Sequence, residues 1–257
     1  MILSTPNLFA FFLILARLAG LFSVAPIFSD RAIPQTMKLA MIVWISLLLW
    51  FVVPLPKVVF TTNLDVMLSL IFEFFLGFVI GFIPRIIFLG VQMAGSLMDM
   101  QMGLSVAATF DPSTGGQTTI MERLMFYLAI AIFFLTNSHH LFLVSILESF
   151  KVIPLVKSIS YPGLLEQVGQ LAGEIFFTGL EMSMPILIII FMLDFALGLL
   201  ARLAPQVNVF SLGFQIKPMI GLWIFLFTLP VLITEFDGMV NHMMDQVYRL
   251  YAEVRPI

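Results

Sequence analysis

The sequence predicts an all-α protein of the membrane, and two observations lead to this fold class. Of the 257 residues, 61% are hydrophobic and only 11% are charged, whereas a soluble domain is usually about 45–50% apolar and about 25% charged. The apolar residues also collect into six stretches that each approach the ~20 residues a helix needs to cross a hydrocarbon core. We therefore expect an integral membrane or membrane-associated helical protein.

The six stretches follow one another along the whole chain. The breaks between them are rich in Pro, Gly, Ser and Asn, which favour loops and helix ends. The sequence has neither a repeat of fixed period nor a low-complexity tract, so it reads as one all-helical unit. We place the stretches at about 8–28, 39–56, 66–98, 120–147, 168–200 and 213–234.

Charged residues do not follow the pattern of simple lipid-facing spans. If the N-terminus faces outward, the basic residues divide five against five between inner and outer loops, so the usual excess of Lys and Arg in cytoplasmic loops gives no orientation. Charged residues also lie inside the apolar stretches, where an ionised side chain at mid-bilayer costs at least ~2.5–3.5 kcal/mol. Such helices are expected to face protein or water more than lipid. The residues are Arg17, Glu73, Arg85, Glu174, Glu181 and Asp194, with Pro84 and Pro185 in the same runs.

A small-residue face is predicted in the third stretch. Glu73, Gly77, Gly81 and Arg85 recur every four residues and therefore lie along one slowly drifting helix face. The GxxxG pair lets another backbone approach closely. The face fits a tight interface with a partner subunit's helix, or packing within the chain; neither interpretation implies catalysis.

A polar stripe is predicted on the fifth stretch. Gln170, Glu174 and Glu181 share a face with Gln167 and Thr178. Two carboxylates there could line a water path, carry protons or pair with a neighbouring subunit, because acids within the membrane are functional candidates. The alternative is a solvated helix outside the bilayer.

The run from Gln92 to Thr119 differs most from the rest of the chain. Gln92, Ser96, Asp99 and Gly103 share a helix face, and Met93, Met98, Met100 and Met102 crowd the same turns. Methionine is flexible and adapts to changing surfaces. The segment that follows is rich in residues that favour turns, which suits either a plain connector or a deformable stopper. It contains Phe110, Asp111, Pro112, Ser113, Thr114, Gly115 and Gly116.

Motifs for enzymatic chemistry are absent from the sequence. There is no cysteine, no HExxH and no GxSxG. His139 and His140 are adjacent, so their side chains point about 100° apart on a helix and make a poor chelating pair. The net charge of −3 and the lack of a basic run argue against a nucleic-acid partner. We expect neither an enzyme nor a bound cofactor.

Four blocks of residues with distinctive motifs follow one another along the chain. The first is Ala25 to Pro34 with Lys38, and the second is Gln92 to Gly116 with QMGLS and FDPSTGG. The third is Asn137 to Leu141 with Ser149 and Phe150. The fourth is Arg202 to Phe210 with Gly213, Phe214 and Lys217. In this order the blocks resemble the FliR family, the flagellar type III export-gate proteins, which are related to the SctT subunits of virulence injectisomes.

The resemblance implies a non-enzymatic subunit of the bacterial inner membrane and flagellar basal body. It implies tilted helical hairpins within a ring of FliP-like and FliQ-like subunits, with an FlhB-like protein at the base and unfolded flagellar proteins as substrates. Residues 1–200 would be FliP-like and 201–257 a FliQ-like hairpin. The loop from Phe110 to Gly116 would plug the channel and the methionines would form a gasket. An injectisome gate subunit or, from the acids alone, a proton-coupled transporter are the alternatives.

Overall fold

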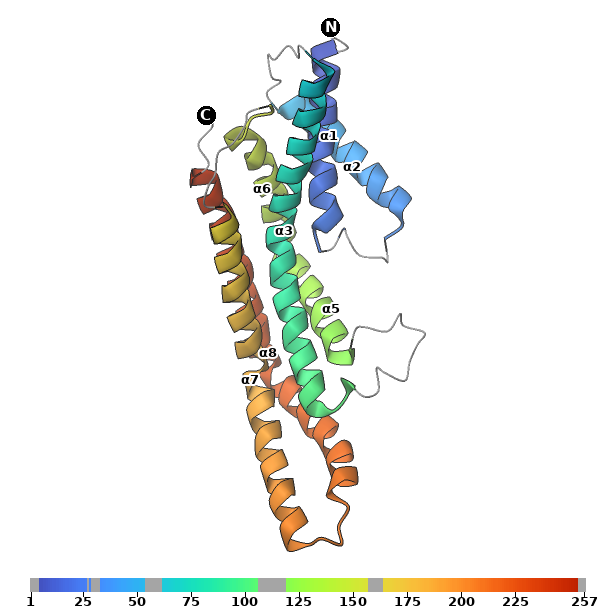
Figure 1. Cartoon of the computed structure of the whole chain (residues 1–257), viewed down its shortest axis with the longest axis vertical. Helices are drawn as coiled ribbons and strands as arrows, with labels where there is room; N and C mark the ends of the chain where they lie inside the picture. The colour runs from blue at the N-terminus through green and yellow to red at the C-terminus, as the bar shows by residue number, and fades with distance from the viewer. Residues whose placement is uncertain are drawn as a thin grey trace. The chain divides into compact units, whose positions relative to one another are not determined.

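A computed structural model describes residues 5–26, 28, 33–53, 62–105, 119–156 and 164–253. Every regular secondary-structure element within these ranges is an α-helix (Figure 1), which confirms the predicted all-α fold class. They are α1 (Thr5–Val24), α2 (Gln35–Val52), α3 (Asn63–Met102), α5 (Ile120–Leu135), α6 (Ser138–Val152), α7 (Leu164–Leu203) and α8 (Val209–Glu253).

Four of these helices are long and apolar enough to cross a membrane. They are α2, α3, the part Ala172–Leu203 of α7 and the part Val209–His242 of α8. Helices α5 and α6 would add a fifth span if together they form one broken crossing. The apolar part of α1, Leu8–Val24, is shorter than these helices.

The predicted apolar stretch 120–147 is divided into two helices. Asn137 has φ 58°, in the left-handed region, which a right-handed helix with φ near −63° cannot contain. Asparagine reaches this region more readily than most residues because its short polar side chain can bond locally. The polar run from Thr136 to His140 lies at this break, but our prediction joined the apolar residues on its two sides into one stretch.

The chain forms two compact units. Unit 1 consists of Met1–Ile86, Asn137–Gly169 and Val240–Ile257, and unit 2 of Ile87–Thr136 and Gln170–Met239. Three helices, α3, α7 and α8, contribute to both units. The predicted division near residue 200 into FliP-like and FliQ-like parts concerns relatedness to other subunits and stays a prediction.

In unit 1, α1 and the first half of α3 pack backbone against backbone. A Cβ added to Gly77 would lie 1.8 Å from the Arg17 carbonyl oxygen, and one added to Gly20 would lie 2.0 Å from the Phe74 carbonyl oxygen. Only glycine permits this approach. The close crossing brings buried side chains of α1 directly against those of α3.

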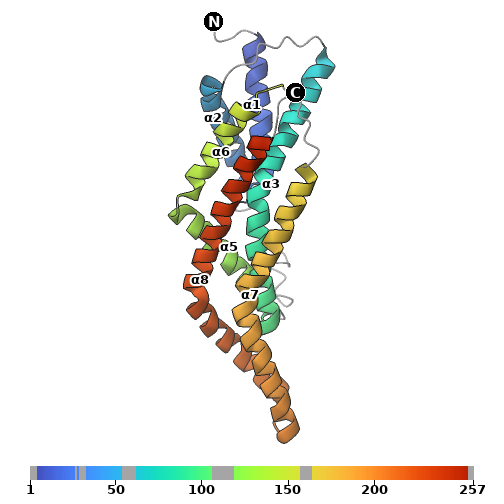
Figure 2. The ribbon, with the colours of Figure 1, turned by 90° about the vertical axis from the view of Figure 1, so that its left-hand side faces the viewer.

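In unit 2, the second half of α3 packs against α5, α7 and α8. The Phe88 ring makes edge-to-face contacts with Phe126, Phe133 and Phe236 at centroid distances of 5.9, 6.0 and 5.8 Å. Gly179 of α7 approaches Gly90 of α3, since an added Cβ would lie 2.5 Å from the Gly90 carbonyl oxygen. A short turn joins α7 to α8 in a long hairpin (Figure 2). These contacts hold the second half of α3 against its neighbours in unit 2.

Candidate functional site

The end of α3 is closed by a main-chain contact of Asp99. The Leu104 N–H donates to the Asp99 carbonyl oxygen at 3.0 Å, and Gly103 lies between them with φ +78°. A left-handed residue just after the helix is a common C-terminal cap, and glycine adopts it without steric penalty. The helix that precedes the predicted turn-rich segment therefore has a well-defined end.

The Asp99 side chain also reaches the start of α5. Its Oδ2 accepts hydrogen bonds from the backbone N–H of Met121 at 2.8 Å and of Glu122 at 3.2 Å. These N–H groups belong to the first helical turn, where they have no partner within the helix. Asp99 is fully buried, so the charge-assisted contacts are shielded from water.

Close packing supports the same junction. A Cβ added to Gly95 would lie 2.6 Å from the Glu122 Cα, so the first turn of α5 rests on the α3 backbone. The Thr119 N–H donates to Glu122 Oε2 at 3.4 Å. Leu104 and Thr119, on either side of the segment 106–118, are thus both tied to the Asp99 region. We call Gly95, Asp99, Gly103, Met121 and Glu122 the loop base.

The predicted plug residues Phe110, Asp111, Pro112, Ser113, Thr114, Gly115 and Gly116 lie outside the described residues. The predicted gasket methionines divide between two environments. Met98 and Met102 are fully buried, whereas Met100 is 62% exposed. Met102 packs against α8, because a Cβ added to Gly221 would lie 2.6 Å from the Met102 side chain. A gasket role for these residues stays a prediction.

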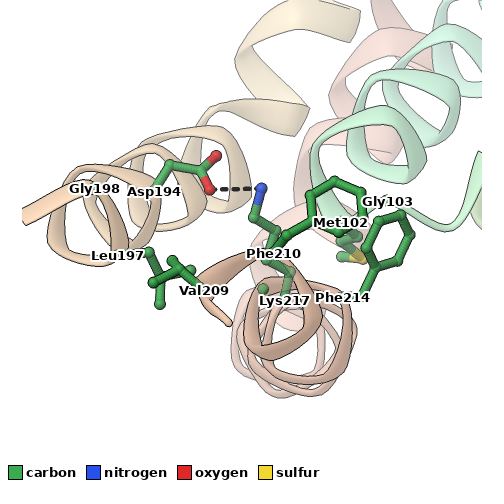
Figure 3. A pocket seen from close by; sticks show the side chains of 10 residues that line it. Met102, Gly103, Asp194, Leu197, Gly198, Val209, Phe210, Phe214 and Lys217 are labelled. Atoms are coloured by element: carbon green, nitrogen blue, oxygen red, sulfur yellow. Dashed lines mark ion pairs between the residues drawn. The ribbon is translucent and has the colours of Figure 1, made fainter. Parts of the chain in front are cut away.

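A half-open pocket of about 350 Å³ lies beside the end of α3 (Figure 3). Its wall is mainly apolar, and one ion pair crosses it from α7 to α8: Lys217 Nζ lies 2.5 Å from Asp194 Oδ1. The pairing neutralises two charges of the apolar hairpin. The lining residues are Met102, Gly103, Asp194, Leu197, Gly198, Val209, Phe210, Gly213, Phe214 and Lys217.

The predicted stripe of Glu73, Gly77, Gly81 and Arg85 faces α1 over most of its length. Glu73 is buried and forms an ion pair with Arg17, and Gly77 and Gly81 contact the backbone of α1. Arg85 is half-buried. These are contacts within the chain, as one of the two alternatives expected, while a contact of this face with another subunit stays a prediction.

We did not predict from the sequence that Arg17 pairs with Glu73, although both were recognised as charged residues within apolar stretches. Their shared contact depends on how α1 crosses α3. Four-residue spacing within one helix cannot report that crossing. The signal that could have suggested it is a single basic residue in the first stretch and a single acid in the third.

The predicted polar stripe of α7 lies on its surface. Gln170, Glu174 and Glu181 are all exposed, and Asp194 further along the helix pairs with Lys217. In the described part of the chain there is no group of three His, Asp or Glu side chains placed to hold a metal ion. The centroids of the His139 and His140 imidazole rings lie 4.2 Å apart.

Helices of spanning length define an all-helical, multi-pass membrane protein. The family model described as bacterial export proteins, family 1, matches residues 8–243, and the chain belongs to this family.

The chain is similar to flagellar biosynthetic protein FliR from several bacteria. It is 32% identical to FliR of Pectobacterium carotovorum subsp. carotovorum, over 95% of this chain and 92% of the relative. It is 30% identical to FliR of Escherichia coli (strain K12), over 93% and 90% of the two chains. Identity to FliR of Bacillus subtilis (strain 168) is 26%, over 95% of each.

These matches confirm the resemblance to the FliR family. The chain is a component of the flagellar protein-export apparatus and a multi-pass protein of the bacterial inner membrane.

Proposed function

We propose that this chain forms part of the flagellar export channel and plugs it at rest with the loop from Phe110 to Gly116. The observation that carries the proposal is the loop base. One buried carboxylate, Asp99, receives the first N–H groups of α5, and its carbonyl oxygen receives the N–H that closes α3. A segment that must block a passage and then move aside needs firmly held ends, and this arrangement supplies them.

The surroundings of the loop base suit a seal. Met98 and Met102 are buried on the same helical turns as Asp99, and flexible thioethers can repack when a neighbour moves. The half-open apolar pocket beside Gly103 offers further adaptable surface. The gasket therefore belongs to the same proposal as the plug.

The partners of the channel would be FliP-like and FliQ-like ring subunits and an FlhB-like subunit, with unfolded flagellar proteins as cargo. Large apolar side chains are exposed on the long helices, among them Trp44, Phe51, Phe191 and Phe227. Surfaces of this kind need lipid or protein to cover them. The flagellar names of the relatives favour this assembly over a virulence injectisome.

The subunit would act without catalysis or a cofactor, as a structural part of the gate. A proton-coupled transporter finds less support, because Asp194 is engaged by Lys217 and the acids of the α7 stripe are exposed.

The test is deletion of Pro112–Gly116 in the gate assembled in cells. We expect ion leak through the resting membrane to rise, because the loop can no longer fill the passage. A five-residue Gly-Ser replacement of the same length is the matched control for loop length, and co-purification of partners reports assembly. Unchanged conductance in a fully assembled gate would refute the plug.

A further inference from the structure

Unit 1 contains a buried ion pair that the proposed plug does not use. Arg17 of α1 donates from Nε to Glu73 Oε2 of α3 at 2.6 Å, and each side chain is 1% exposed. Burying two charges is unfavourable unless their remaining donors and acceptors are also satisfied. The other contacts of the pair therefore indicate why it is tolerated.

The other hydrogen bonds of the Arg17 guanidinium go to the end of α6. Nη1 donates to the Ser149 carbonyl oxygen at 3.1 Å and Nη2 to the Ile153 carbonyl oxygen at 3.0 Å. The Ser149 carbonyl oxygen also accepts the Ile153 N–H at 3.0 Å, so Arg17 adds a second donor there. The last carbonyls of a helix carry the negative end of the helix dipole, which favours a cation. The Phe150 ring lies 4.2 Å from the guanidinium carbon, within the range of a cation–π contact. Arg17 thus caps α6 from a distant part of the sequence.

Glu73 holds the turn that follows α6. Its second oxygen, Oε1, accepts a hydrogen bond from the Val156 N–H at 3.2 Å. Val156 has φ +70°, a conformation that is a genuine outlier for a β-branched residue. A strained residue persists only where its surroundings determine its conformation, and such residues concentrate at functional positions.

The glycines of α1 and α3 keep the pair in place. Gly77 lies one turn after Glu73 and its backbone touches Arg17 itself. The two backbones are too close to approach further, and separation of α1 from α3 would pull the guanidinium away from Glu73. The close crossing therefore restricts where Arg17 and Glu73 can meet.

We propose that Arg17 and Glu73 form a positioning centre that fixes where α6 ends and the conformation of residues 153–156 after it. Arg17 holds the helix end through the fork of its guanidinium, and Glu73 holds the strained Val156. The centre holds the end of α6 and residues 153–156 in one arrangement, on which export depends. It does not depend on the plug, since none of its residues belongs to the loop base.

The deciding variant is Arg17→Lys. A lysine keeps the positive charge beside Glu73, but its single ammonium group cannot reproduce the planar fork that reaches three acceptors. If the ion pair alone mattered, the variant would behave like the wild type. If Arg17 positions α6, backbone hydrogen exchange at Ile153 and Val156 should be faster by about tenfold, because local opening becomes easier.

Hydrogen exchange is measured by mass spectrometry on the purified subunit, and export of flagellar protein is measured in cells. Arg85→Lys, the same change at a half-buried arginine on α3, is the matched control and should leave exchange at both amides unchanged. We expect the Arg17→Lys variant to export less while its thermal unfolding midpoint stays near that of the control. Wild-type exchange and export in the Arg17→Lys variant would overturn the proposal.

A second variant separates positioning from stability. Arg17→Met with Glu73→Met replaces the pair by apolar side chains, a change that is often neutral or stabilising. We expect the double variant to unfold near the wild-type temperature but to show fast exchange at Ile153 and Val156 and reduced export. Protected amides with normal export would contradict a positioning role. If the double variant does not fold, the Arg17→Lys result decides.

Discussion

At the residue scale, Asp99 shows how a single buried carboxylate can join two helix ends. Its side chain caps the first turn of α5 while its own carbonyl oxygen closes α3. Both interactions satisfy groups that a helix leaves unpaired at its ends. Buried N–H groups that lose their acceptor cost about 1–3 kcal/mol each, so the loop base depends strongly on this residue.

Asp99→Ala should loosen the loop base and raise ion leak through the assembled gate. The reason is that the Met121 and Glu122 N–H groups lose their common acceptor, at an expected cost of about 1–3 kcal/mol each. Leak conductance in cells is the measurement, with partner co-purification to verify assembly.

Asp99→Asn is the matched control, because its amide oxygen can still accept from the same N–H groups. It should leak less than Asp99→Ala. If both variants conduct as little as the wild type, the loop base does not hold the closed state. This conclusion would stand even if the Pro112–Gly116 deletion leaks.

At the element scale, the crossing of α1 over α3 depends on the absence of side chains at a few positions. The backbones touch at Gly20, Gly77 and Gly81. Small residues allow such packing in membrane proteins, where burial of apolar surface between helices supplies little driving force. The crossing also sets the reach from Arg17 to Glu73, so local packing and the buried charges are coupled.

Gly77→Ala should destabilise the subunit by about 1–3 kcal/mol or more, as overpacking does. The new Cβ would lie 1.8 Å from the Arg17 carbonyl oxygen, and backbone cannot rotate away as a side chain can. Thermal unfolding of the purified subunit in detergent measures the change.

Gly173→Ala on α7 is the matched control, since its added Cβ would meet nothing within 4 Å. It should be neutral or stabilise by up to about 1 kcal/mol through higher helix propensity. Similar unfolding temperatures for the two variants would mean that the crossing can relax and that its glycines are not required.

At the scale of the whole molecule, large apolar surfaces are left uncovered by the chain itself. Phe227 is 77% exposed and Phe191 is 70% exposed, and charged or polar residues such as Glu174 and Glu181 are exposed on the same long helices. Lipid would cover the apolar surface but not the exposed carboxylates. A protein assembly can cover both.

Gentle solubilisation of the membrane and affinity purification of this chain should therefore recover FliP-like and FliQ-like proteins. Mass spectrometry identifies the co-purifying chains, and a variant with a weakened crossing, Gly77→Ala, should recover less of them. A homo-oligomer that contains only this chain would contradict the proposed assembly and would favour a transporter.

Much of the fold could be predicted from the sequence because each helical membrane segment can be recognised from its own residues. Apolar length and Pro- or Gly-rich breaks placed the long helices, with the main error at Asn137, where a left-handed residue divides one apolar stretch into α5 and α6. The four-residue spacing of Gly77 and Gly81 predicted a face for close packing. It could not say that α1 lies on that face.

The sequence by itself determined the helical membrane class, the family and the position of the turn-rich segment after α3. These follow from composition, periodicity and motif order, which need no knowledge of distant contacts. Only the tertiary structure decided that Arg17 caps α6 beside Glu73 and that Asp99 reaches the start of α5. The physical reason is that such partners meet through helix crossings, and a crossing depends on packing between elements rather than on the pattern within either one.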